Sequence, residues 1–463
     1  MTFQSLIDAP RQADRSVCVI GMGYVGLTLA VVLADNGSAV FGVEQQPAVA
    51  ACLARGVPHF HEPGLGDRLR RLVRQDRLKV GEQIPTGLDA DVFIITVGTP
   101  LDGAGVVRTD MIGRAARQLA GHLRPRSLVV LRSTVSVGVT RSIVAPILDQ
   151  AGVPYDLAFC PERTVEGQAL SELPLLPQIV GADDEEAGLR AARFFSRITP
   201  TVIRVSSLEA AETIKLIDNS YRDLRFAFAN QIALFCEQAG LNALEIIRAA
   251  TLSYPRTDVP RPGPVGGPCL EKDPHIFAQS MGKAGIEGSL MAAARGINER
   301  QPAESVARIK AVAASIADFP AAPKIRVLGL AFKGRPATDD IRGTMARPIL
   351  RALRQAFPGG SFGGYDAMIA PEEIERQFDI TGFDSLQAAF DHANLIVIAN
   401  NYATFETMDI EGLSASMAPP GIIYDYWNSI GEPKLLGKGI TYIGLGTSDT
   451  GFVGREKMLA GAG

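Results

Sequence analysis

The sequence is poor in the residues that build disulfide frameworks, metal centres and membrane spans. Its 463 residues include five cysteines and five histidines, and no apolar run approaches the roughly eighteen residues that a membrane-spanning helix needs. An odd, scattered set of cysteines favours a reducing cytoplasm, and the lack of ligand spacing predicts no metal. The cysteines are Cys18, Cys52, Cys160, Cys236 and Cys269.

The chain also lacks a large excess of either positive or negative charge. The formal net charge is −4, so the composition predicts neither nucleic acid nor an anionic membrane as a partner. The hydrophobic fraction of 46% can fill several cores, and a chain of this length predicts about two to four domains. These features favour a soluble enzyme.

Near its start the chain has the pattern of a dinucleotide-binding unit. A short apolar strand, Val17–Ile20, leads directly into the loop GMGYVG at Gly21–Gly26. An apolar helical stretch, Leu27–Leu33, follows, and a second strand, Ala39–Val43, ends at Glu44. This order of strand, glycine loop, helix, strand and acid is typical of a βαβ unit that binds NAD.

Each part of this pattern has a physical role. Gly21 permits the tight turn, Gly23 admits the pyrophosphate, and Gly26 lets the helix pack closely on the strand. The start of the helix supplies amide donors and partial positive charge to the phosphates. Glu44 can accept both ribose hydroxyls, and its charge would repel the extra phosphate of NADP. The cofactor is therefore predicted to be NAD.

Further apolar strands at Val92–Val97, Leu128–Leu131 and Leu157–Phe159 alternate with helical segments. This alternation predicts an α/β fold with a doubly wound parallel sheet. Because ligands bind at the carboxyl ends of such strands, polar residues in the loops that follow are candidate site residues. The alternative is that these residues only form ordinary caps and turns, and for Thr99 and Ser133 the two interpretations are evenly balanced. The candidates are Thr99, Ser133, Thr134, Glu162 and Arg163.

A long helix is predicted over residues 208–238, ended by Gly240. Apolar residues surround much of it, as expected of a helix buried between domains or subunits. Lys215, Asn219 and Arg222 are four and then three residues apart, so they share one face. Buried groups of these kinds need partners, and an anionic substrate would satisfy them. A solvated stripe paired with neighbouring acids is the alternative.

The run GPVGGPCLEKDP at Gly263–Pro274 carries the most specific chemistry. Glycines let the backbone approach a ligand and prolines stiffen it, while the pair Asp273-Pro274 indicates a helix start with the aspartate as cap. Cys269 lies just before that start with Lys272 close by, a setting that favours a thiolate. We therefore predict that Cys269 is a nucleophile. A small buried hydrophobe is the alternative.

The C-terminal third has the pattern of a second, degenerate Rossmann unit. Strands are predicted at 324–332, 395–399, 422–424 and 441–443, without a GxGxxG loop. A second NAD is therefore not expected there. The first of these strands is followed by Lys333 and Arg342, two cations that suit a phosphate-bearing ligand.

The motifs of the whole chain can be set in order. They are GMGYVG at 21–26, EPGL at 62–65, GTP at 98–100, STV at 133–135, PER at 161–163, the pair Lys215/Asn219, GGPCLEKD at 266–273 and AFKG at 331–334. Together they resemble the nucleotide-sugar 6-dehydrogenases of the UDP-glucose/GDP-mannose dehydrogenase family. The resemblance implies two Rossmann-like parallel-sheet domains joined by a long central helix. We expect an NAD-binding domain at 1–205, a central helical domain at 206–318 and a UDP-sugar-binding domain at 319–463.

In such enzymes the alcohol at sugar carbon six is oxidised twice by NAD, through an aldehyde, to a carboxylate. The resemblance implies that Cys269 forms a thiohemiacetal and then a thioester that water hydrolyses. Lys215 and Asn219 would stabilise the oxyanion. Asp273 or Glu162 would be the hydrolytic base, and the sequence does not decide between them. Thr134 would position the water.

The remaining site residues follow from the same resemblance. The long helix would form a homodimer, with Arg256 reaching the neighbouring subunit's site. The full expected NAD set is Gly21, Gly23, Tyr24, Val25, Gly26, Glu44, Thr99, Ser133, Thr134 and Lys272. The full expected substrate set is Glu162, Arg163, Lys215, Asn219, Arg222, Arg256, Gly266, Phe332, Lys333 and Arg342.

Three features, two of them departures from the UDP-glucose branch, point to the substrate. The runs CPER at 160–163 and NSYRD at 219–223 resemble the branch that acts on UDP-N-acetylhexosamines, and the late strand lacks the sugar-nucleotide-binding arginine near residues 424–428. We expect UDP-ManNAc before UDP-GlcNAc, with UDP-glucose as runner-up. Such enzymes make uronic acids in the cytoplasm for surface polysaccharides.

Two other classes share part of the pattern. A single-step dehydrogenase of the hydroxyacid type has a Rossmann domain and a helical lysine, but it needs no cysteine. A non-catalytic NAD-binding protein would keep Gly21–Gly26 without needing Cys269, Lys215 and Asp273 together. The number of NADH formed per substrate separates the first rival from the expected enzyme.

Overall fold

The computed structural model describes residues 14–103, 105–431 and 436–447. The first thirteen residues of the expected NAD-binding domain and the last sixteen of the expected UDP-sugar-binding domain lie outside this range. The chain forms two compact units. The first contains Met1–Asp218 and His275–Gly288, and the second contains Asn219–Pro274 and Ser289–Gly463.

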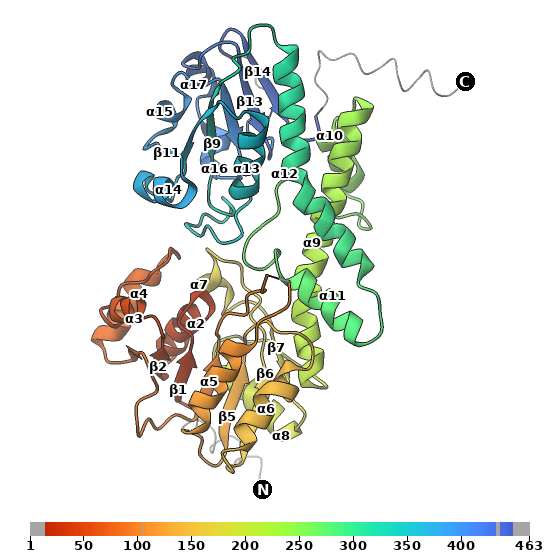
Figure 1. The fold of residues 1–463 in the computed structure, drawn as a ribbon. Helices are drawn as coiled ribbons and strands as arrows, with labels where there is room; N and C mark the ends of the chain where they lie inside the picture. Colours follow the sequence, from red (N-terminus) through yellow and green to blue (C-terminus); the bar gives the residue numbers. More distant parts are fainter. Residues whose placement is uncertain (1–13, 104, 432–435, 448–463) are drawn as a thin grey trace. The chain divides into compact units, whose positions relative to one another are not determined.

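Strands and helices alternate along both units (Figure 1). The strands are β1 (Ser16–Ile20), β2 (Ala39–Val43), β3 (Leu78–Gly81), β4 (Val92–Ile95), β5 (Ser127–Leu131), β6 (Tyr155–Phe159), β7 (Gln178–Gly181), β8 (Val202–Val205), β9 (Lys324–Leu328), β10 (Ser361–Tyr365), β11 (Thr381–Gly382), β12 (Leu395–Ile398), β13 (Gly421–Asp425) and β14 (Ile440–Gly444).

The helices lie mostly between these strands. They are α2 (Tyr24–Asp35), α3 (Pro47–Ala54), α4 (Leu65–Arg74), α5 (Asp110–Ala120), the π-helical turn η1 (Thr140–Val144), α6 (Ala145–Asp149), α7 (Ala169–Glu172), α8 (Glu185–Phe195), α9 (Leu208–Ala239), α10 (Ala243–Thr251), α11 (Asp273–Lys283), α12 (Ser289–Ser315), α13 (Ala346–Ala356), α14 (Pro371–Phe378), α15 (Leu386–Phe390), α16 (Ala403–Thr407) and α17 (Ile410–Ala415).

The first unit is built on an eight-stranded sheet in the order β3-β2-β1-β4-β5-β6-β7-β8. Its first six strands are parallel, and β7 then pairs with β6 in the antiparallel sense. The central strands β4 and β5 are buried at every position, which is expected of a parallel sheet covered by helices on both faces. The predicted doubly wound fold is confirmed.

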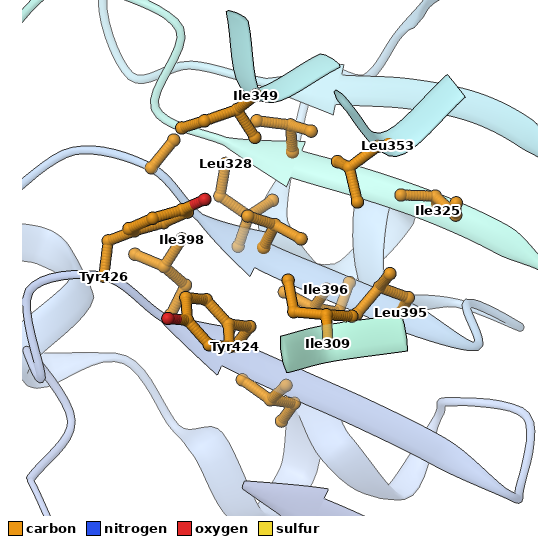
Figure 2. Close-up of a cluster of buried hydrophobic side chains, with 14 of the residues drawn as sticks. Ile309, Ile325, Leu328, Ile349, Leu353, Leu395, Ile396, Ile398, Tyr424 and Tyr426 are labelled. Atoms are coloured by element: carbon orange, nitrogen blue, oxygen red, sulfur yellow. The ribbon is translucent and has the colours of Figure 1, made fainter. Parts of the chain in front are cut away.

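The second unit holds a six-stranded parallel sheet in the order β11-β10-β9-β12-β13-β14. Its core packs sheet residues such as Leu328 and Ile396 against Ile309 of α12 and Ile349 of α13 (Figure 2). The strand expected to reach residue 332 ends at Leu328, because Gly329 adopts a left-handed φ of 83°. The residues after β9 are therefore a loop.

Helix α9 is the long central helix expected from the sequence. It begins after Ser207, whose hydroxyl accepts a hydrogen bond from the Ala210 amide, and it ends before Gly240, which has a φ of 69°. These are the ordinary N-terminal and C-terminal stops of an α-helix. In the described part of the chain, no helix is long and apolar enough to cross a membrane.

Candidate active site

The glycine loop joins β1 to α2 in the first unit. Gly21 has a left-handed φ of 97°, and a Cβ added at Gly26 would overlap the Gly21 carbonyl oxygen. By contrast, a Cβ at Gly23 would meet no atom of the described residues within 4 Å. The loop thus has a forced turn, a close helix–strand contact and an open middle position, which is the arrangement that admits a pyrophosphate.

Glu44 directly follows the neighbouring strand β2 and contacts the same loop. One carboxylate oxygen accepts the Met22 amide at 3.2 Å, and the other accepts the Gln46 amide at 2.9 Å. The side chain is half-buried, so lone pairs remain for the two hydroxyls of a ribose. These residues fit NAD, which when bound would supply a hydride acceptor at this edge of the sheet.

Tyr24, in the glycine loop motif, hydrogen-bonds within the protein. Its hydroxyl donates to Glu62 at 2.5 Å, and the Glu62 carboxylate also accepts the amides of Gly167 and Leu170. Burial, more than the adjacent Glu62 carboxylate, raises the pKa of Tyr24, so the phenol stays a donor. Sequence reasoning noted the EPGL motif but did not assign Glu62, which holds the loop after residue 163 near the start of α2.

Two expected cofactor residues join loops of the sheet edge. The Thr99 hydroxyl donates to the Thr134 carbonyl at 2.6 Å, and the Ser133 hydroxyl donates to the Val97 carbonyl at 2.7 Å. These bonds connect the loops that follow β4 and β5. Thr99 and Ser133 therefore have the structural role that was the alternative in the sequence, and their contact with NAD stays a prediction.

Glu162 is buried in an ion pair that the sequence did not reveal. Arg132 donates to its carboxylate from Nη2 at 2.6 Å and from Nε at 3.2 Å. The other oxygen accepts the amides of Arg163 and Thr164, each at 2.7 Å. Burial alone would raise the pKa of Glu162, but Arg132 and these donors lower it overall. The available signal in the sequence was an arginine directly after the apolar run Leu128–Leu131.

Arg163 and Lys215 also lie in the first unit. Arg163 donates from Nε to Asp218 on α9 at 2.8 Å, so its guanidinium is already paired. Lys215 is buried on α9, and its charge helps to lower the pKa of Glu162. Lys215 thus belongs to the environment of the Glu162 carboxylate.

In the second unit, Asn219 and Asp273 form the centre of the candidate site. The Asn219 amide donates to Asp273 at 2.5 Å, and Lys272 Nζ lies 2.8 Å from the other carboxylate oxygen. Asp273 is fully buried where α11 begins. Both oxygens of this carboxylate contact side chains, whereas the sequence indicated a helix cap.

Cys269 lies on the turn that leads into α11. Its carbonyl accepts the Asp273 amide at 2.9 Å, and its side chain is exposed. Exposure excludes the alternative of a small buried hydrophobe. The turn is fastened by the Gly267 amide, which donates to the Gly343 carbonyl at 2.8 Å, and a Cβ at Gly266 would overlap that carbonyl oxygen.

The expected phosphate-binding residues flank the same turn. Gly267 lies against the Phe332 ring, and Lys333 Nζ lies 5.2 Å from that ring's centroid. Arg342 pairs with Asp340 through Nε at 2.8 Å and Nη2 at 2.5 Å, yet its side chain remains exposed. The second unit thus brings the thiol and the two candidate phosphate cations into one loop cluster.

Two further arginines of the expected substrate set are exposed. The expectation that Arg222 is buried with Lys215 and Asn219 is wrong, because Arg222 is exposed. Burial of the helix changes along its length, and Tyr221 beside it is exposed as well. Arg256 is also exposed and stacks over the Tyr254 ring at 5.7 Å.

The described residues contain no group of three or more His, Cys, Asp or Glu side chains that could hold a metal ion. A glycine loop with an acid, a paired amide and carboxylate, and an exposed thiol on a fastened turn suit oxidation of a phosphate-bearing substrate.

Comparison with known proteins identifies the family. Models of the UDP-glucose/GDP-mannose dehydrogenase family match the chain in succession: the NAD binding domain over residues 15–199, the central domain over 209–300 and the UDP binding domain over 326–432. These matches confirm NAD as the cofactor.

Individual relatives align along almost their full length. The UDP-N-acetyl-D-mannosamine dehydrogenase of Pyrococcus horikoshii is 31% identical over 94% of this chain and 99% of the relative. A solved structure of UDP-D-ManNAc dehydrogenase from that organism has a TM-score of 0.82 at 31% identity, covering 95% of this chain and 100% of that chain. A solved UDP-glucose dehydrogenase from Pyrobaculum islandicum has a TM-score of 0.83 at 26% identity, covering 95% and 99%.

The resemblance inferred from the motifs is thus confirmed by full-length similarity. Since the three domain models match in order and a relative aligns from end to end, the chain belongs to the UDP-glucose/GDP-mannose dehydrogenase family and is an NAD-dependent nucleotide-sugar dehydrogenase.

Proposed function

We propose that the protein oxidises carbon six of a UDP-N-acetylhexosamine to the uronic acid, with Cys269 as the nucleophile. The observation that carries this proposal is the exposed Cys269 side chain on a glycine-fastened turn, immediately before the buried Asn219–Asp273 pair. A thiol that is accessible and close in sequence to a helix start is a competent nucleophile, whereas a buried structural cysteine is inert.

The chemistry balances over two oxidations. The primary alcohol loses a hydride and a proton to become an aldehyde. The Cys269 sulfur then bonds to the aldehyde carbon, and the carbonyl oxygen takes a proton, giving a thiohemiacetal. Loss of a second hydride and a proton leaves a thioester. Water adds to its carbonyl carbon, the C–S bond breaks, and the products are the carboxylate and the free thiol.

The buried polar residues have two further roles, stabilising the oxyanion and activating the hydrolytic water. Lys215 and Asn219 lie one turn apart on α9 and would stabilise the oxyanion that develops at carbon six. We assign the hydrolytic base to Asp273 rather than Glu162. The carboxylate of Glu162 already accepts four hydrogen bonds from Arg132 and two amides, and its pKa is lowered. A weaker, fully occupied carboxylate is the poorer base.

The N-acetylated substrate is favoured by the relatives and by the sequence. UDP-N-acetyl-D-mannosamine dehydrogenases from Pyrococcus horikoshii and other organisms align with this chain, and its CPER run at 160–163 agrees with that branch. We place UDP-ManNAc ahead of UDP-GlcNAc. UDP-glucose is the second candidate, because the Pyrobaculum islandicum UDP-glucose dehydrogenase has the same fold over 95% of this chain.

A homodimer through α9 is part of the proposal. Tyr221, Phe228 and Phe235 recur every seven residues, so they form one stripe along the helix. Each of these side chains is about half exposed or more, at 51%, 58% and 56%. An exposed aromatic stripe on a central helix favours a self-complementary contact with a second copy. We further propose that the enzyme works in the cytoplasm on precursors of surface polysaccharides.

One assay tests the proposal directly. NADH formation is measured with UDP-ManNAc, UDP-GlcNAc, UDP-glucose and GDP-mannose, and the acid product is quantified. We expect two NADH per sugar and about tenfold to hundredfold discrimination in kcat/KM against glucose. Turnover of UDP-glucose at or above the rate for both N-acetylated sugars overturns the substrate. Acid formation by Cys269→Ala at near wild-type rate overturns the thiol mechanism, and one NADH per sugar favours a single-step dehydrogenase.

A further inference from the structure

One face of α9 holds both ends of the segment that carries the thiol. Asn219 donates to Asp273 at the end of this segment, and Asn230 contacts Gly263 at its beginning. Asn230 follows Asn219 by eleven residues, about three helical turns, so both amides lie on the same face. Cys269 lies between the two attachment points.

The contact at Gly263 is a double one. The Gly263 amide donates to Asn230 Oδ1 at 2.9 Å, and Asn230 Nδ2 donates to the Gly263 carbonyl at 3.0 Å. Both bonds are buried, so water is not available to replace them. A Cβ at Gly263 would meet the Trp427 ring at 2.8 Å. The segment is thus held between the Asn230 amide and the face of Trp427.

The orientation of the Asn230 amide is itself determined by a buried network. Asn230 Nδ2 also donates to Asn298 Oδ1 at 3.0 Å, and Asn298 Nδ2 donates to Asp223 Oδ1 at 2.9 Å. Arg295 donates to that same oxygen at 2.6 Å. Because every member is buried, turning the Asn230 amide over would leave donors facing donors. The network therefore keeps Oδ1 toward the Gly263 amide.

The exposed thiol depends on such anchors for its position. Cys269 does not pack in the core, so its location is set by where its segment is fastened. The fastenings are Asn230 on Gly263, the Gly343 carbonyl on the Gly267 amide, and Asn219 on Asp273. We infer that Asn230 is a positioning residue of this enzyme: through Gly263 it sets the place of the Cys269 sulfur for attack on the aldehyde. This inference rests on the proposed role of Cys269.

Comparing the rates of the two oxidations separates an effect on the position of the sulfur from an effect on the stability of the fold. Formation of the aldehyde needs no thiol, whereas the second oxidation requires the thiohemiacetal on Cys269. A displaced sulfur should therefore slow the second step selectively, and misplacement by about 1 Å can cost on the order of a hundredfold. In an Asn230 variant we expect free aldehyde to escape, with the NADH formed per acid rising above two. A loss of folded protein lowers both steps together and leaves this ratio unchanged.

The experiment compares Asn230→Ala with the isosteric Asn230→Asp. Aspartate can accept the Gly263 amide but cannot donate to the Gly263 carbonyl or to Asn298, so both variants should behave alike. We expect kcat for acid formation to fall about tenfold to hundredfold, with the KM for NAD unchanged within about twofold. Aldehyde is trapped with an aminooxy probe, and alkylation of Cys269 by iodoacetamide is followed by peptide mass.

Asn394→Ala is the matched control. Asn394 also clamps two backbone groups of the second unit, the Lys324 amide at 3.0 Å and the Ala418 carbonyl at 3.3 Å, but neither belongs to the thiol segment. The control should keep two NADH per acid. The inference is overturned if Asn230→Asp keeps the wild-type ratio and the wild-type alkylation rate while Cys269→Ala is inactive. If Cys269→Ala still makes acid, the proposed thiol mechanism fails instead.

Discussion

The side-chain amide of Asn219 lies 2.5 Å from a carboxylate oxygen of Asp273, and the other oxygen lies 2.8 Å from Lys272 Nζ. The proposed oxyanion stabiliser therefore contacts the proposed hydrolytic base directly. Each oxygen of the buried carboxylate has a donor, which holds the group in one orientation. A water activated by Asp273 would thus be placed beside the amide that supports the developing charge.

The first prediction concerns Asp273→Asn, which keeps the shape of the side chain but removes its charge. We expect hydrolysis of the thioester to slow by roughly a hundredfold or more. NADH should then appear as a burst of two per active site, and intact mass should reveal an acyl adduct on Cys269. Asp379→Asn is the control, because Asp379 is exposed and its left-handed φ of 54° tolerates asparagine. A linear time course without an adduct would exclude Asp273 as the base.

The second prediction concerns the buried Glu162–Arg132 pair. Burial on its own would raise the pKa of Glu162, but Arg132 and the backbone donors bring it below the ordinary value of 4.5. A lowered pKa stabilises the fold above that ordinary value, and the contribution is lost as the pH falls through the folded-state pKa. Glu162→Gln should therefore flatten the acid dependence of stability.

At neutral pH the same variant leaves the buried Arg132 with neutral acceptors and without a charged partner. The expected loss is about 3–5 kcal/mol in the unfolding free energy, measured as a shift of the urea transition at pH 7. No acyl adduct should accumulate, since Glu162 is not assigned as the base. Equal acid sensitivity of the variant and the wild type as the pH falls below about 4.5 would contradict the ion-pair account.

Local patterns predicted much of this structure. The glycine loop, the acid at Glu44, the long helix and the turn before α11 are each specified by residues close together in the chain. The causes are local. About ten residues of sequence are enough to recognise a glycine that must adopt a positive φ, a helix cap or an apolar period. Cys269 was singled out as a candidate nucleophile for the same reason.

The sequence did not predict pairings between residues that are far apart in the chain. Arg132 and Glu162 are thirty residues apart, and Asn230 and Gly263 are thirty-three apart. Nothing in their local sequence names the partner. Strand β10 escaped notice because its sequence, SFGGY, is rich in glycine and has little β-propensity of its own. Arg222 was misjudged because helical spacing gives the face of a side chain but not its burial.

The third prediction concerns selectivity for NAD over NADP. Glu44→Ala should lower the ratio of the two kcat/KM values by about tenfold for each 1.4 kcal/mol of repulsion that is removed. The ratio is measured with both cofactors at one ionic strength. Gln46→Ala serves as the control, since only its backbone amide contacts Glu44. An unchanged ratio in Glu44→Ala would remove this carboxylate from the ribose site.

The fourth prediction concerns the stripe of Tyr221, Phe228 and Phe235 on α9. Phe228→Glu should convert the proposed dimer to a monomer, because a charge would be buried without a partner in the contact. Light scattering coupled to gel filtration measures the mass. Leu175→Glu is the matched control, as this side chain is 73% exposed in the first unit. A wild-type protein that is monomeric at micromolar concentration would dismiss the stripe as an interface.

The fifth prediction sets two glycines of one loop against each other. A Cβ at Gly26 would overlap the Gly21 carbonyl oxygen, whereas a Cβ at Gly23 would meet none of the described protein atoms within 4 Å. Gly26→Ala should therefore lower the melting temperature, since the helix cannot approach the strand. Gly23→Ala should melt like the wild type, because the added methyl group displaces no protein atom.

For NAD binding, Gly23→Ala is expected to be the harmful variant, although it leaves the stability unchanged. The open side of Gly23 is where a pyrophosphate would approach, so the methyl group of Gly23→Ala would crowd the ligand rather than the fold. Forcing a methyl group into an occupied contact costs about 1–3 kcal/mol, which corresponds to roughly a fivefold to hundredfold weaker Kd for NAD. Calorimetric titration measures it. Wild-type affinity in Gly23→Ala would mean that the cofactor does not pass over this residue, whatever the stability of the variant.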